Sequence, residues 1–155
     1  MQTINPGVQR FIERFGRYLE TLGASRSSGQ VLAFLLISEK PQSLDDMVEA
    51  LQISKASASL GTRVWEQTNL IERVHVRGDR KVYYQVAPDI SVSLASAALQ
   101  KFEAIATIAE EGLAALEEDQ PNANVKLREF ARVYRRLHQQ VPKLFADIMA
   151  GADEE

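Results

Sequence analysis

The sequence contains no cysteine and only two histidines, His75 and His138. Without cysteine the chain forms no disulfide, no cysteine-based zinc site and no catalytic thiolate. The two histidines lie on different predicted elements and lack a suitably spaced carboxylate partner, so we expect no metal site and no cofactor. The motifs GxSxG and HExxH, a glycine-rich phosphate loop and a paired-acid motif are also missing. We therefore predict that the protein is not an enzyme.

Long apolar runs are missing as well. The longest, VLAFLLI at residues 31–37, is far shorter than the roughly 20 residues of a membrane span. The first residues, MQTINPGVQR, lack the charged-then-apolar pattern of a secretion signal. We expect a soluble cytoplasmic protein with no membrane partner, and 155 residues suit one domain or one domain with a helical extension.

Positive charge is scarce overall but concentrated in the middle of the chain. The formal net charge is −3, yet residues 53–88 carry six basic and three acidic side chains. Binding to phosphate depends on local charge, so an acidic protein with a local basic patch can bind nucleic acid.

The N-terminal third predicts two helices. Apolar residues at helical spacing indicate a first helix over about residues 8–22, which Gly23 ends. Ser27 or Ser28 is expected to cap a second helix that is apolar on most sides and therefore central. Pro41 is expected to end this second helix.

Residues 43–68 predict a helix-turn-helix. Ser43 and Ser54 are good N-terminal caps for two helices, and the short connection QIS between them has the length of a helix-turn-helix turn. Asp45 and Asp46 fall in the first turn of the first helix, where they favour its dipole. On the second helix one face is expected to point inward, and it consists of Ala58, Gly61, Thr62, Trp65 and Thr68.

Residues 71–86 predict a β-hairpin with basic residues at its turn. A two-residue Gly78-Asp79 loop would place Val76 opposite Lys81, whereas a three-residue loop places Val76 opposite Val82 and Val74 opposite Tyr84. We favour the three-residue loop because it keeps the apolar residues on one face. In this register Arg77 and Lys81 share the outer face and Arg80 is at the tip.

A helix-turn-helix followed by a basic hairpin is a winged helix, so the predicted fold is mainly α, an α+β winged helix with a two-stranded wing. Residues 7–90, above all the helix-turn-helix and the wing motif GDRKVYY, resemble the GbsR-type branch of the MarR superfamily of bacterial transcriptional regulators. The resemblance implies a homodimer on a palindromic operator, with the helix from Ser54 in the major groove, Arg80 in the minor groove, and Asp79 orienting Arg80. Some members of this branch respond to choline or related osmolytes. Gln52 and Asn69 replace glycines that are usual in the family, and a residue other than glycine is strained there if φ is positive.

We expect residues 1–90 to form the DNA-binding domain and residues 91–155 a region of long dimerisation helices, the second one kinked or restarted at Pro142. The function predicted is a DNA-binding transcriptional regulator, with repression favoured over activation. The alternative is a winged-helix module that binds proteins and not DNA.

Four arginines, 128, 132, 135 and 136, are expected either to pair with acidic residues 110–119 or to contact the partner subunit or DNA. The residues predicted to contact double-stranded DNA are Ser54, Lys55, Ser57, Ser59, Arg63, Arg77, Arg80 and Lys81. A small-molecule effector, if choline-like, would need a cage of aromatic faces, and the candidates are Phe11, Phe15, Tyr18, Phe102 and Tyr134.

Overall fold

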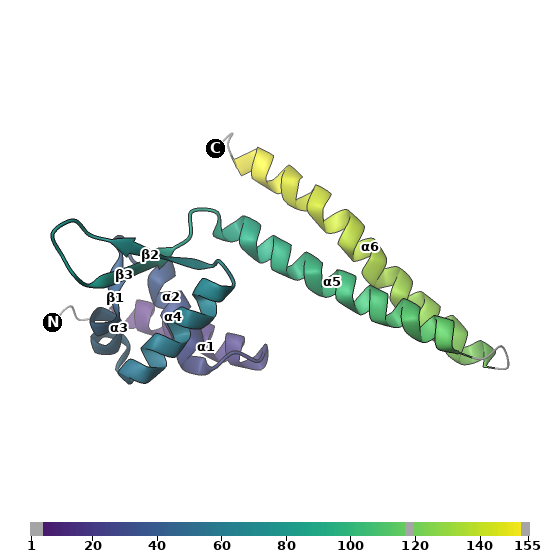
Figure 1. Cartoon of the computed structure of the whole chain (residues 1–155), viewed down its shortest axis with the longest axis horizontal. Coiled ribbons are helices and arrows are strands. Elements are labelled where there is room, and N and C mark those ends of the chain that lie inside the picture. The colour runs from purple at the N-terminus through teal and green to yellow at the C-terminus, as the bar shows by residue number, and fades with distance from the viewer. Residues whose placement is uncertain (1–4, 117–119, 153–155) are drawn as a thin grey trace. The chain divides into compact units, whose positions relative to one another are not determined.

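The computed structural model describes residues 5–116 and 120–152. The chain divides into two compact units, residues 1–90 and residues 91–155 (Figure 1). No helix among the described residues combines the length and the apolar character needed to cross a membrane.

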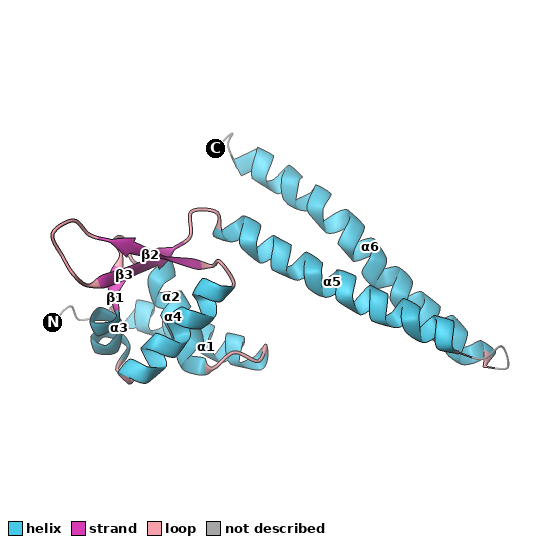
Figure 2. Ribbon diagram, in the orientation of Figure 1, coloured by secondary structure: helices cyan, strands magenta, loops and turns pink. Residues whose placement is uncertain are grey.

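The first unit holds four helices and a small sheet. The helices are α1 (Pro6–Thr21), α2 (Arg26–Leu36), α3 (Leu44–Leu51) and α4 (Lys55–Gln67). Three antiparallel strands, β1 (Gln42–Ser43), β2 (Ile71–His75) and β3 (Val82–Val86), lie in the order β1-β3-β2 (Figure 2). The winged-helix prediction is confirmed. Strand β1 was missed, because two residues are too few to show the alternation that marks a strand.

Helix α2 is the centre of this unit, as its apolar sequence predicted. Its packing against α1 depends on two facing glycines, since a Cβ on Gly29 would lie 2.9 Å from the Cα of Gly16. No larger residue permits such a close helix crossing. The core around α2 is made of Ile12, Val31, Leu32, Ala33, Leu35, Met47, Leu51, Ala58, Trp65, Leu70, Ile71 and Tyr84.

Both predicted ends of α2 were wrong by a few residues. The N-cap is Ser25, whose hydroxyl oxygen accepts a hydrogen bond from the amide of Ser28 at 3.1 Å. Ser25 has the extended backbone that a cap requires, whereas Ser27 and Ser28 are already helical. The helix ends at Leu36 and not at Pro41, because the chain must leave the helix early enough for Gln42 and Ser43 to pair with β3.

The predicted register of the hairpin was also wrong. Arg73 pairs with Tyr84 and Val74 with Tyr83, so the ladder has the register of the two-residue loop and not that of the three-residue loop. Strands β2 and β3 stop at His75 and Val82, however, and residues 76–81 form a longer connection.

The register follows from what the sheet buries. Cross-strand partners share a face, so the inward face carries Ile71, Tyr84 and Val86. Val74 lies on the opposite face with Tyr83, and Val76 is exposed beyond the end of β2. Burying the larger Ile71 and Tyr84 therefore outweighs gathering the valines on one face.

The second unit consists of α5 (Ile90–Ala115) and α6 (Pro121–Ala152), which run antiparallel (Figure 1). The rings of Phe102 and Tyr134 lie 6.2 Å apart, and Nδ1 of His138 lies 3.2 Å from the carbonyl oxygen of Leu99. Helix α6 does not restart at Pro142, which lies inside it. Among the described residues of this unit only alanines are buried, namely Ala106, Ala109 and Ala131.

Candidate nucleic-acid interface

The helix-turn-helix is held by the caps that the sequence indicated. Ser43 and Asp46 form a capping box, in which the Ser43 amide donates to the Asp46 carboxylate at 2.7 Å and the Asp46 amide donates to the Ser43 hydroxyl at 3.2 Å. Ser54 caps α4 by accepting a hydrogen bond from the amide of Ser57 at 3.1 Å. The turn between the helices has Gln52 at a φ of 54°, so this glutamine has the left-handed backbone that usually favours glycine.

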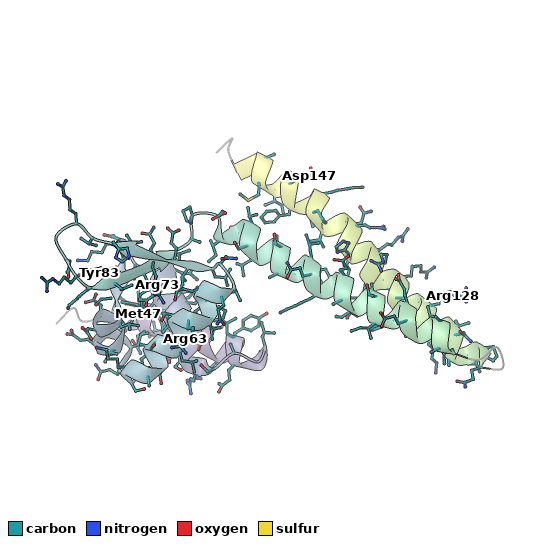
Figure 3. The ribbon with its side chains drawn as sticks, in the orientation of Figure 1. Met47, Arg63, Arg73, Tyr83, Arg128 and Asp147 are labelled. Carbon is teal, nitrogen blue, oxygen red and sulfur yellow. The ribbon has the colours of Figure 1, made fainter. Side chains whose placement is uncertain are left out.

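Helix α4 is anchored on α2 through its inward face. The Trp65 Nε1 donates a hydrogen bond to the carbonyl oxygen of Ser28 at 2.7 Å, and a Cβ on Gly61 would lie 3.1 Å from Val31 Cγ2. Thr68, predicted to face inward, is exposed, because α4 ends at Gln67 and the chain turns there, with Asn69 at a φ of 56°. The anchored face leaves Lys55 and Arg63 exposed on the other side of α4. Figure 3 labels Arg63 on this helix.

The serines predicted to bind DNA divide into two kinds. The hydroxyl of Ser54 is occupied by the cap, and it also lies 2.9 Å from the hydroxyl of Ser57. Ser59 is half-buried, and its hydroxyl makes no hydrogen bond within the described part of the chain. Of the three, Ser59 thus has the hydroxyl with most freedom to meet a ligand.

The wing is here the hairpin of β2, β3 and the connecting residues 76–81. Its connection begins with a turn closed by a hydrogen bond from the Asp79 amide to the Val76 carbonyl at 3.0 Å, and Gly78 supplies a φ of 88°. The Asp79 carboxylate accepts hydrogen bonds from the Lys81 amide at 2.9 Å and the Tyr83 hydroxyl at 2.7 Å. These bonds lower the pKa of Asp79, the Lys81 amide most, and the bond to Asp79 raises the pKa of Tyr83. Asp79 thus fixes the shape of the connection.

Arg73 joins the wing to α4. Its Nε lies 2.6 Å from one carboxylate oxygen of Glu66 and its terminal nitrogen donates to the other at 3.0 Å. The guanidinium also lies 5.9 Å from the centre of the Tyr84 ring. Figure 3 labels Arg73 and Tyr83 on the wing. Sequence reasoning missed the Glu66–Arg73 pair, since it depends on a contact between two elements.

The two lysines predicted to bind DNA meet at one carboxylate. The Lys55 Nζ lies 2.9 Å from Asp45 Oδ1, and the Lys81 Nζ lies 3.7 Å from Asp45 Oδ2. The hydrogen bond from Lys55 is the largest of the effects that lower the pKa of Asp45. The first residue of α4's helical span and the last residue of the wing's connection are therefore within side-chain reach of each other.

The other predicted cations are free. Arg63, Arg77 and Arg80 are exposed and form no ion pair with any residue in the described ranges. We call Lys55, Arg63, Arg77, Arg80 and Lys81 the cationic patch.

The predicted effector residues belong to different units. Phe11, Phe15 and Tyr18 lie on α1 and, with neighbouring arginines, line an open hollow of about 520 Å³. The rings of Phe11 and Phe15 are 5.7 Å apart, whereas Phe102 and Tyr134 pair with each other in the second unit. Among the described residues, no group of three or more His, Asp or Glu side chains is arranged to hold a metal ion.

One of the four arginines of α6 has an acidic partner. Arg135 donates to both carboxylate oxygens of Glu110, at 3.0 and 2.6 Å, which confirms the predicted pairing with the acidic part of α5 for this residue. The hydrogen bond from Arg135 lowers the pKa of Glu110. Arg128, Arg132 and Arg136 form no ion pair with the residues that the structure describes.

Comparison with known proteins agrees with this architecture. A family model described as "MmpR5-like MarR family transcriptional regulator" matches residues 89–148. The HTH-type transcriptional regulator MmpR5 of Mycobacterium tuberculosis is 30% identical over 125 residues, which cover 80% of this chain and 76% of that protein. The HTH-type transcriptional repressor OpcR of Bacillus subtilis is 29% identical over 89 residues, which cover 57% of this chain and 48% of OpcR. A solved structure, the "Crystal Structure of a transcriptional regulator", has a TM-score of 0.77 and 26% identity and covers 94% of this chain and 99% of its own.

Proposed function

Because this chain belongs to the MmpR5-like MarR family of transcriptional regulators, we propose that it regulates transcription by binding double-stranded DNA as a homodimer. Helix α4 is proposed to enter the major groove and the tip of the wing the minor groove. Repression is the proposed outcome, and the repressor OpcR among the relatives supports it. The family consists of regulators and not enzymes, and it gives no support to a winged-helix module that binds only proteins.

The observation that carries this proposal is the convergence of two DNA-docking elements. Lys55 comes from α4 and Lys81 from the wing, and both reach the same Asp45 carboxylate. A groove-binding helix and a wing that lie this close can contact one stretch of duplex together. The free guanidinium groups of Arg63, Arg77 and Arg80 are then available for phosphates or base edges, as proposed from their positions.

The proposal is tested by selecting DNA from a genomic library with the purified protein and measuring affinity for the selected duplex at several salt concentrations. Counterion release predicts a log–log slope near −0.9 per phosphate neutralised. Arg80→Ala removes one arginine from each protomer of the proposed homodimer, so it should weaken binding and flatten the slope by about 2. Arg17→Ala is the matched control, because Arg17 is an exposed arginine of α1 outside the cationic patch. Salt-insensitive binding, or equal effects of the two substitutions, would contradict the proposal.

The second unit supports the homodimer. Its two helices bury few side chains, while Ile108 and Leu144 are 67% and 61% exposed. Apolar exposure on this scale along two helices is typical of a surface that a second copy covers. Leu144→Glu should therefore shift the mass measured by light scattering toward the monomer, whereas Lys143→Glu, at the neighbouring exposed position, should not. A Leu144→Glu protein with unchanged mass would refute this interface.

The GbsR-type branch and a choline-like effector are finer proposals. The wing motif GDRKVYY supports the branch, and the paired aromatic rings on α1 and between α5 and α6 are the only support for the effector. Titration calorimetry with choline tests the effector proposal directly. Heat of binding that is lost in Tyr134→Leu would support the cage, and the absence of heat would dismiss it.

A further inference from the structure

Asp45 is an acidic residue of α3 that contacts two members of the cationic patch, Lys55 and Lys81. We propose that Asp45 is an internal competitor for DNA phosphate, which occupies Lys55 and Lys81 in the free protein and thereby weakens binding to DNA that offers no well-placed contacts. This inference rests on the proposed function and adds a residue that determines selectivity. Asp45 would act opposite in sign to the cations around it.

The geometry of the three side chains is that of a carboxylate shared by two ammonium groups. One oxygen of Asp45 is 2.9 Å from Lys55 Nζ and the other is 3.7 Å from Lys81 Nζ. A phosphate also presents anionic oxygens to ammonium groups at such distances. A phosphate that reaches both lysines must therefore displace Asp45 or lie beside it, and two like charges at this distance repel each other.

Asp45 is not needed for the fold in the way that its neighbour is. Asp46 makes the capping box with Ser43, and its Oδ2 accepts from both the amide and the hydroxyl of Ser43 at 2.7 Å. The side chains of Asp45, Lys55 and Lys81 are 56%, 69% and 57% exposed. Ion pairs this exposed contribute little to stability. Asp46 thus caps α3, whereas Asp45 faces the cations.

A competitor of this kind raises selectivity because it lowers the affinity for DNA that is bound through phosphate contacts alone. Non-specific binding consists almost entirely of phosphate contacts, so it bears the full effect of the lost attraction. The ratio of the two affinities changes because the operator complex bears less of this penalty. Base contacts of α4 and the wing fix the register of the protein on the operator, and in the proposed complex this register places the phosphates beside Asp45 without displacing it. The charge of Asp45 persists at neutral pH, because its pKa lies below the ordinary value of 3.8.

The test compares Asp45→Asn with Glu49→Gln by fluorescence anisotropy on random-sequence and selected duplexes of about 30 base pairs, long enough for two half-sites. Both substitutions remove one negative charge from α3, and Glu49 is exposed with no ion pair among the described residues. Asp45→Asn changes one such site in each protomer of the proposed homodimer, so it should bind the random duplex about tenfold more tightly, with a salt slope steeper by about 2. The selected duplex should gain less, so the ratio of the two affinities should fall.

A coupling measurement separates competition from a structural effect. In the background Lys55→Gln/Lys81→Gln, the substitution Asp45→Asn should change affinity by less than about twofold, because the cations that it occupies are gone. Unfolding temperatures of all variants should stay close to that of the wild type.

The possible failures are distinguishable. If the wild type binds DNA in a salt-dependent way but Asp45→Asn gains nothing, or gains no more than Glu49→Gln, Asp45 is not a competitor while the proposed function stands. Weaker binding by Asp45→Asn would show that Asp45 positions the lysines for DNA, which also overturns the proposal. If neither the wild type nor Asp45→Asn binds any duplex at low salt, both the proposed function and this inference are wrong.

Discussion

The anchoring of α4 by Trp65 yields a quantitative prediction. Trp65 is 8% exposed, and its Nε1 donates a hydrogen bond to the Ser28 carbonyl at 2.7 Å. Trp65→Phe keeps an aromatic ring but removes this donor and part of the buried surface. The substitution therefore isolates the contact that sets α4 against α2.

Two contributions give the magnitude. A hydrogen bond of this kind is worth about 0.5–1.5 kcal/mol. The smaller ring leaves roughly 40 Å² less apolar surface buried, which at about 25 cal/mol per Å² is about 1 kcal/mol. We expect Trp65→Phe to lower the free energy of unfolding by about 2 kcal/mol, within the usual range for core substitutions.

Urea unfolding followed by circular dichroism at the helix band measures this change, since Trp65 is the sole tryptophan of the sequence and the variant loses its fluorescence. Gln67→Ala is the matched control, because Gln67 is exposed on the same helix, and it should change stability by less than about 0.5 kcal/mol. A loss below about 0.5 kcal/mol in Trp65→Phe would refute the anchoring role. Where both proteins are folded, DNA affinity should stay within about threefold of the wild type, because the cationic patch is intact.

Three further predictions concern helix packing, the wing and the second unit. Gly29→Ala should lower the free energy of unfolding by about 1–3 kcal/mol, because the new Cβ would lie 2.9 Å from Gly16 Cα. Gly151→Ala is the control, because Gly151 has open space around it, and it should be neutral or stabilising by up to about 1 kcal/mol. Urea unfolding of both variants measures the two changes in stability. Tyr83→Phe should speed amide hydrogen exchange at Lys81, because the Asp79 carboxylate loses one of its two anchors, and unchanged exchange there would show that the Tyr83 hydroxyl does not fix the connection. Glu110 has a pKa lowered from its ordinary value of 4.5, so its stabilisation is complete above pH 4.5 and is lost as the pH falls through the lower pKa of the folded state. Thermal unfolding of Glu110→Gln should accordingly match the wild type at low pH and fall below it at neutral pH, and a gap that persists in acid would contradict the Arg135 pairing.

Features that depend on neighbours in sequence were predictable. The caps at Ser43 and Ser54 and the end of α1 near Gly23 follow from a few adjacent residues, since a cap is a hydrogen bond within one turn. The winged-helix architecture followed from the order of these local elements.

Features that depend on two distant segments were not predictable from the sequence. Ser25, Ser27 and Ser28 are all chemically able to cap a helix, and the path of the chain after α1 selects Ser25. The register of the wing is set by Ile71 and Tyr84 meeting the core and by β1 pairing with β3. The valine pattern pointed to the other register, because a strand of five residues carries too little alternation to outweigh tertiary burial.

The sequence by itself determined which residues are candidates for binding DNA, since it contains their charge and their position in the helix-turn-helix and the wing. Only the tertiary structure decided which of these cations are free. Arg63, Arg77 and Arg80 have no ion pair among the described residues, while Lys55 and Lys81 share Asp45. An ion pair between separate elements depends on where folding brings the two side chains, and hydrophobic burial elsewhere in the chain decides that position.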